Sequence, residues 1–112
     1  MNEFSIKFEG QKGQRGTGKC SWYGDEAAGA YTSCGNIFNP NEMTGAQLGG
    51  VNPKLPCGTK IRVTNTKNKK SVDITITDKG SHASRLIDLS KGSFAKIEDT
   101  SKGIMECSYV VL

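Results

Sequence analysis

Residues 72–94 read VDITITDKGSHASRLIDLSKGSF and contain the clearest structural pattern in the chain. Apolar and polar residues alternate over residues 72–76, which is the period-2 pattern of a strand with one buried face. We expect this strand to end at Asp78, because a loop that contains glycine and serine follows. A short apolar segment then ends at Asp88. The stretch therefore predicts a β protein with two aspartates at the ends of regular structure.

The residues after Asp88 predict a short helix. Ser90 is a favourable N-cap residue, and Phe94 and Ile97 follow at helical spacing. Functional sites are usually built where strands and helices give way to loops. Asp78 and Asp88 are therefore candidate site residues.

Three further segments predict strands. Residues 20–23 are rich in aromatic and small residues, residues 61–64 alternate before a turn, and residues 105–112 place Cys107, Tyr109 and Val111 on one face. Residues 25–50 show no clean period, because Gly, Ala, Asn and Pro interrupt it. Within them, residues 42–48 predict either a brief strand or a turn of helix.

Size and composition favour one small β domain. The chain has 112 residues, of which 35% are hydrophobic and 14 are glycine, so a loop-rich β protein is favoured over a helical bundle. Residues 1–18 are rich in Gly, Gln and Lys and predict a flexible N-terminal tail, and residues 19–112 predict the ordered domain. No long apolar run indicates a membrane span, and we expect a monomer.

The formal net charge of +4 comes mostly from dispersed lysines. One local cluster, Lys67, Lys69 and Lys70, falls in the predicted hairpin turn. Such a cluster at a hairpin tip is typical of a solvated turn, so no nucleic-acid partner is expected.

The four cysteines predict two disulfides. The chain has no C-x-x-C pair and a single histidine, which argues against a zinc site, and we expect no cofactor. Disulfides indicate an oxidising compartment, so the protein is expected to be secreted or extracellular. Three pairings are possible. We favour Cys20–Cys107 and Cys34–Cys57. Cys20 and Cys107 lie in the first and last predicted strands, whereas Cys34 and Cys57 lie in loops.

A series of motifs in fixed order carries a family resemblance. These motifs are Cys20-Ser21-Trp22-Tyr23-Gly24, Thr44-Gly45-Ala46, Leu55-Pro56-Cys57-Gly58-Thr59-Lys60-Ile61-Arg62-Val63-Thr64-Asn65, Thr77-Asp78-Lys79-Gly80 and Ile87-Asp88-Leu89-Ser90. Over residues 19–112 the series resembles the double-psi β-barrel domains of rare lipoprotein A and expansin-like proteins. The resemblance implies an all-β fold with one small helix, namely a six-stranded double-psi β-barrel, and residence outside the cell or in its envelope.

The same resemblance bears on catalysis. Lytic members of the rare lipoprotein A group use a Glu, an Asp and a His, and the matching positions here are Asn36, Asn39 and Gln47. An amide cannot titrate and so cannot serve as the general acid of glycosidic cleavage. We therefore expect the protein not to be an enzyme, although Glu42 lies near these positions. Asp88 matches the aspartate of the expansin Asp-Leu-Ser motif.

Six residues are candidates for binding, each with an alternative structural role. For the aspartates, the alternative is that Asp88 braces the predicted helix and that Asp78 accepts hydrogen bonds from loop amides. For the aromatic residues, the alternative is a place in the core, and for the lone histidine it is a place in a loop. The candidates are Asp78, Asp88, Trp22, Tyr23, Tyr31 and His82.

The resemblance implies three functions. The first is a non-catalytic inhibitor of papain-like cysteine proteases, since small secreted members with two disulfides include such an inhibitor; residues 25–32 and 79–84 are its candidate loops. The alternative is an expansin-like protein that binds or loosens cell-wall polysaccharide. The least favoured is a peptidoglycan lytic enzyme.

Overall fold

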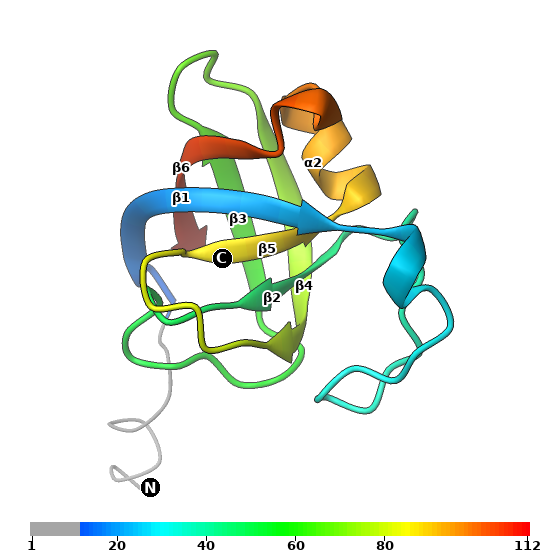
Figure 1. Cartoon of the computed structure of the whole chain (residues 1–112). Helices are drawn as coiled ribbons and strands as arrows, with labels where there is room; N and C mark the ends of the chain where they lie inside the picture. Colours follow the sequence, from blue (N-terminus) through cyan, green and yellow to red (C-terminus); the bar gives the residue numbers. More distant parts are fainter. Residues whose placement is uncertain (1–11) are drawn as a thin grey trace, which may run out of the picture.

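The computed structural model describes residues 12–112, and six strands in it close into a barrel in the order β1-β5-β2-β4-β3-β6 (Figure 1). The elements are β1 (Arg15–Tyr23), η1 (Asp25–Ala27), β2 (Thr44–Gln47), β3 (Lys60–Asn65), β4 (Ser71–Lys79), β5 (Ile87–Ser90), α2 (Lys91–Ile97), η2 (Thr100–Lys102) and β6 (Ile104–Val111). The predicted six-stranded barrel with one small helix is confirmed.

The barrel mixes parallel and antiparallel pairs. β1 pairs with β5 and β2 pairs with β4 in parallel, whereas the remaining neighbours are antiparallel. Closure gives every strand two neighbours, so no barrel strand presents a free edge for pairing with another chain.

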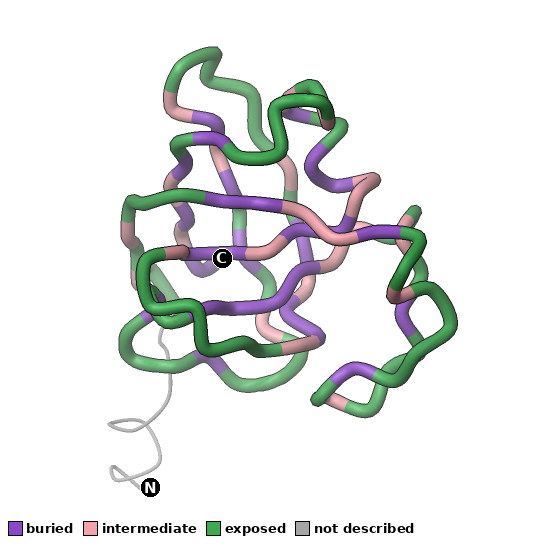
Figure 2. Tube along the Cα trace, viewed as in Figure 1, coloured by how far each residue is buried: buried purple, intermediate pink, exposed green. Residues whose placement is uncertain are grey.

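Alternation along the strands fills the barrel with mostly aliphatic side chains. Figure 2 marks the buried positions along the backbone in purple. Each fully buried aliphatic or aromatic side chain contributes about 1.5–3 kcal/mol. The core consists of Cys20, Val51, Leu55, Ile61, Val63, Ile74, Ile76, Leu86, Ile87, Leu89, Phe94, Ile97, Met105, Cys107, Tyr109 and Val111.

The strand β2 is short, and its second residue, Gly45, lies close against the side chains of its neighbours. A Cβ at Gly45 would approach Cδ1 of Ile74 to 2.7 Å and Cγ2 of Ile87 to 3.2 Å. A larger residue would require the Ile74 and Ile87 side chains to shift. The prediction for residues 42–48 allowed a strand or a helical turn, and the structure contains the strand.

Helix α2 begins as the sequence predicts. The Ser90 hydroxyl accepts a hydrogen bond from the Ser93 amide at 3.2 Å, and it donates to the Glu42 carbonyl at 2.6 Å. On the inner side of the helix, Phe94 and Ile97 are buried in the core.

The first strand begins earlier than predicted. It starts at Arg15, which pairs with Val110 of β6, whereas we expected it to start at Cys20. Residues 15–18, which the sequence placed in the flexible tail over residues 1–18, therefore belong to the barrel. The start of that tail, residues 1–11, lies outside the described residues.

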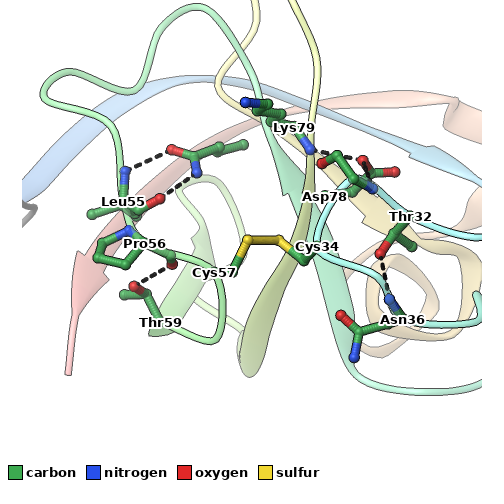
Figure 3. Close-up of a disulfide and its surroundings, with 11 residues drawn as sticks. Thr32, Cys34, Asn36, Leu55, Pro56, Cys57, Thr59, Asp78 and Lys79 are labelled. Carbon is green, nitrogen blue, oxygen red and sulfur yellow. Dashed lines mark hydrogen bonds between the residues drawn. A yellow bond between two sulfur atoms is a disulfide. The ribbon is translucent and has the colours of Figure 1, made fainter.

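Both predicted disulfides are present. Cys20–Cys107 joins β1 to β6 inside the barrel, and Cys34–Cys57 ties together two loops on its surface (Figure 3). Within residues 12–112, no helix is long and apolar enough to cross a membrane.

The two disulfides should contribute unequally to stability. Cys20–Cys107 closes 87 residues and Cys34–Cys57 closes 23. Loop-closure entropy then gives about 4–5 kcal/mol for the first and about 3 kcal/mol for the second. We expect the Cys20→Ala/Cys107→Ala variant to lose more free energy of unfolding in urea than the Cys34→Ala/Cys57→Ala variant. Equal losses would contradict this ranking.

Candidate functional site

Two aspartates flank β2 on the outer face of the barrel. Asp88 of β5 is paired with Ser21 of β1 on one side and with Ala46 of β2 on the other, and Ala46 is paired in turn with Asp78 of β4. Neighbouring strands lie about 4.8 Å apart, so the two aspartate backbones are roughly 10 Å apart. Ala46, which has a small side chain, lies between them in the sheet.

Asp88 is half buried, and its pKa is raised. Burial is the largest cause, and the nearby carboxylates of Glu26 and Asp78 add to it. A hydrogen bond from the Ser21 hydroxyl at 3.1 Å and the charge of Arg85 act in the opposite direction. Asp88 therefore keeps its proton to a higher pH than an ordinary aspartate, which is the property required of a general acid.

Asp78 anchors a neighbouring loop. Its Oδ1 accepts hydrogen bonds from the amide of Ser33 at 3.0 Å and from its own neighbour Lys79 at 2.9 Å. The alternative role that the sequence suggested for Asp78, satisfying loop amides, is confirmed. Asp88 makes no corresponding contact with helix α2, where Ser90 supplies the cap, so the suggestion that Asp88 braces the helix is wrong.

Tyr23 lies beside both aspartates. Its ring stacks on Phe38 with a centroid separation of 4.4 Å and an interplanar angle of 17°. Burial, followed by the charges of Asp78 and Asp88, raises the pKa of Tyr23. Its hydroxyl is buried and has no hydrogen-bond partner within residues 12–112. A buried unpaired hydroxyl costs about 1–3 kcal/mol, and a ligand that hydrogen-bonds to it would offset this cost.

A cavity of about 270 Å³ adjoins Phe38. Hydroxyl and amide side chains dominate its wall, Glu42 is its one charged residue, and the buried Thr44 hydroxyl lacks a partner among the described residues. Such a lining suits an uncharged ligand rich in hydroxyl groups. The lining residues are Thr32, Asn36, Ile37, Phe38, Asn39, Glu42, Thr44, Thr75 and Thr77.

The three amides matched to lytic residues do not lie together. Asn36 and Asn39 line this cavity, whereas Gln47 does not. Gln47 is buried, and its side-chain amide donates to the Leu55 carbonyl at 2.6 Å and accepts from the Leu55 amide at 2.8 Å. Figure 3 shows Leu55 in the segment that leads to Cys57 and the Cys34–Cys57 disulfide. Gln47 therefore holds a loop.

The remaining predicted residues are dispersed. Trp22 packs against Phe94, and its ring N–H donates to the Thr100 carbonyl at 3.0 Å, so it belongs to the rim of the core. His82 is exposed in the loop after β4 and is hydrogen-bonded to Ser84. Tyr31 is exposed on a loop beside the cavity.

Sequence reasoning missed several residues of the site. Ser21, Ala46 and the two outward threonines of β4, Thr75 and Thr77, were not proposed. The alternation that placed Ile74 and Ile76 inside also places the threonines outside, so the signal was present for these two.

Comparisons with known proteins give the family. The family model described as lytic transglycolase matches residues 15–109. A Neisseria meningitidis protein named endolytic peptidoglycan transglycosylase RlpA is 40% identical over 78% of this chain and 35% of its own length. The Campylobacter jejuni protein of the same name is 36% identical over 81% of this chain and 32% of its own. The chain thus spans about a third of these two relatives.

Two solved structures are similar. The Streptomyces papain inhibitor has a TM-score of 0.72 at 26% identity, over 90% of this chain and 96% of its own. The Clavibacter michiganensis expansin in complex with cellohexaose has a TM-score of 0.68 at 22% identity, over 88% of this chain and 50% of its own. At that identity the expansin supports the fold alone.

These relatives correct one expectation. The absence of titratable groups at Asn36, Asn39 and Gln47 led us to expect a protein that is not an enzyme. Several relatives at 32–40% identity are named endolytic peptidoglycan transglycosylases, so that expectation is contradicted. The inference assumed that catalysis needs those three positions. By its ordered motifs, its closed barrel and the match over residues 15–109, the chain belongs to the lytic transglycolase family of double-psi β-barrels.

Proposed function

We propose that this protein acts on the glycan strands of peptidoglycan, and that Asp88 is the acid that protonates the glycosidic oxygen. The observation that carries the proposal is the position of Asp88: a half-buried carboxyl with a raised pKa, on the outer face of the barrel next to Tyr23 and Ala46. The names of the relatives supply the substrate class.

The chemistry follows from the surroundings of Asp88. Glycosidic cleavage requires an acid that protonates the leaving oxygen, and burial keeps the Asp88 carboxyl protonated to higher pH. The Ser21 hydroxyl holds one carboxyl oxygen in place. The unpaired Tyr23 hydroxyl and the cavity lined by threonines and asparagines offer hydrogen bonds to sugar hydroxyls. We place this chemistry outside the cell or in its envelope, where disulfides persist.

A second candidate function is inhibition of papain-like cysteine proteases. It is favoured by the match to the Streptomyces papain inhibitor, which extends over 96% of that chain. Two disulfides make the scaffold rigid, and a rigid scaffold loses little conformational entropy when it binds.

The first test is digestion of purified peptidoglycan. We expect the wild-type protein to release soluble glycan fragments, detected by chromatography and mass spectrometry, and the rate to fall as the pH rises through the raised pKa of Asp88. Asp88→Asn should reduce release by at least about a hundredfold, since general acids contribute about 10²–10⁴. Asp73→Asn, which removes an exposed partner of Arg62 away from the site, should retain activity. Release by Asp88→Asn at the wild-type rate would refute the role of Asp88.

The second test concerns stability and separates loss of activity from loss of fold. Because the pKa of Asp88 is raised in the folded state, folding favours the protonated form, and that stabilisation is lost as the pH rises through the folded-state pKa. Asp88→Asn carries no charge. We therefore expect its free energy of unfolding, measured in urea, to exceed that of the wild type increasingly as the pH rises from about 3 to about 7. A difference that is independent of pH would contradict this expectation.

The third test is a titration of papain. If the second candidate function holds, stoichiometric addition of the protein suppresses hydrolysis of a peptide substrate by papain, while trypsin, a serine protease, remains active. Full papain activity in the presence of a large excess of the protein would eliminate this candidate.

A further inference from the structure

A hairpin of residues 28–39 projects from the barrel beside the candidate site (Figure 1). Its two short arms are joined by backbone hydrogen bonds from Phe38 to Ala30 at 2.8 Å and from Thr32 to Asn36 at 2.7 Å. Between these bonds Tyr31 and Ile37 face each other as an antiparallel bridge pair. The segment is therefore an ordered structure, here named the 28–39 hairpin.

Four contacts hold the 28–39 hairpin in a fixed position. Cys34 is bonded to Cys57, and its amide donates to the Thr77 carbonyl at 3.2 Å. The amide of Ser33 donates to Asp78, and Phe38 stacks on Tyr23. A covalent bond, two hydrogen bonds and a ring stack thus fix this loop to β1, β4 and the loop before β3.

The 28–39 hairpin presents apolar side chains to water. Tyr31 is 76% exposed and Ile37 is 59% exposed, the two largest values among the exposed large hydrophobic residues in residues 12–112. Side chains of directly opposed residues lie about 4.5–5.5 Å apart, so the two form one patch. The 28–39 hairpin is held in place and yet exposes these two apolar side chains, which is typical of a binding surface.

The chemistry next to the patch indicates its occupant. Ile37 also lines the cavity whose wall is mainly threonine and asparagine, so the patch continues into a surface of hydroxyl and amide groups. A sugar chain has hydroxyl groups at the ring edges and apolar C–H groups on the ring faces. The patch and cavity together match both features. Phe38 of the cavity wall stacks on Tyr23, and the charge of Asp88 is one of the causes that raise the pKa of Tyr23, so Asp88 lies close to this surface.

We propose that the 28–39 hairpin is a distal glycan subsite, in which the Tyr31 ring stacks on a sugar face and Ile37 extends the apolar contact, so that affinity depends on chain length. The inference rests on the glycan function proposed above. It assigns to Tyr31 and Ile37 the contact with sugar residues that lie beyond those at Asp88.

The test measures binding of N-acetylglucosamine oligomers by calorimetry, using the full chain and chitotriose and chitohexaose as probes. We expect the wild type to bind chitohexaose about tenfold more tightly than chitotriose, which corresponds to one well-packed contact. Tyr31→Ala and Ile37→Ser should each remove most of this gain. Tyr31 does not line the cavity, so Tyr31→Ala should also leave the affinity for chitotriose unchanged, which shows that this variant is folded. Leu112→Ser is the control: it replaces another exposed apolar residue, which is 42% exposed and lies outside the hairpin, and it should bind both oligomers as the wild type does.

The outcomes separate the two proposals. If the wild type binds neither oligomer, the glycan function fails, and the subsite fails with it. If the wild type binds both oligomers equally, or if both hairpin variants keep the gain with chitohexaose, the glycan function stands and the distal subsite is refuted.

Discussion

The closure of the barrel depends on the four residues of β2, which bridge β5 and β4. This strand pairs antiparallel with β5 and parallel with β4, and it has room there because Gly45 has no side chain to press on Ile74 and Ile87. The pairing of β2 with both neighbours also determines the geometry of the candidate site. Ala46, the next residue, separates Asp88 from Asp78, so the packing constraint that closes the core also fixes the spacing of the two carboxyl groups.

The site retains groups that the fold leaves poorly satisfied. Asp88 is held where burial opposes its charge, and the Tyr23 hydroxyl is buried without a partner in the described part of the chain. By contrast, the side chains of Gln47 and Ser90 are hydrogen-bonded to backbone partners. Groups that cost stability in the folded state are the ones free to bind a ligand, and here they lie side by side.

Local patterns in the sequence predicted the strands, the helix cap at Ser90 and the disulfide partners, because alternation and capping act between near neighbours. Irregular segments were harder, since β2 is defined by the packing of Gly45 against distant residues. The adjacency of Asp88 and Asp78 across Ala46 follows from strand register, which local patterns do not encode. Trp22 was proposed for binding, yet alternation from the buried Cys20 already turned it towards the core. The catalytic inference failed because it assumed that activity depends on titratable groups at the three matched positions.

The two disulfides differ in exposure, and this difference links the site to its redox environment. Cys20 and Cys107 are buried in the core, at 0% and 1% exposure, whereas Cys57 is on the surface and Cys34 is partly accessible. Thiol exchange requires access to the sulfur, so a mild reductant reaches the surface bond first. The barrel would then stay closed while the 28–39 hairpin loses its covalent anchor. Two hydrogen bonds and the ring stack on Tyr23 would still hold the hairpin against the barrel.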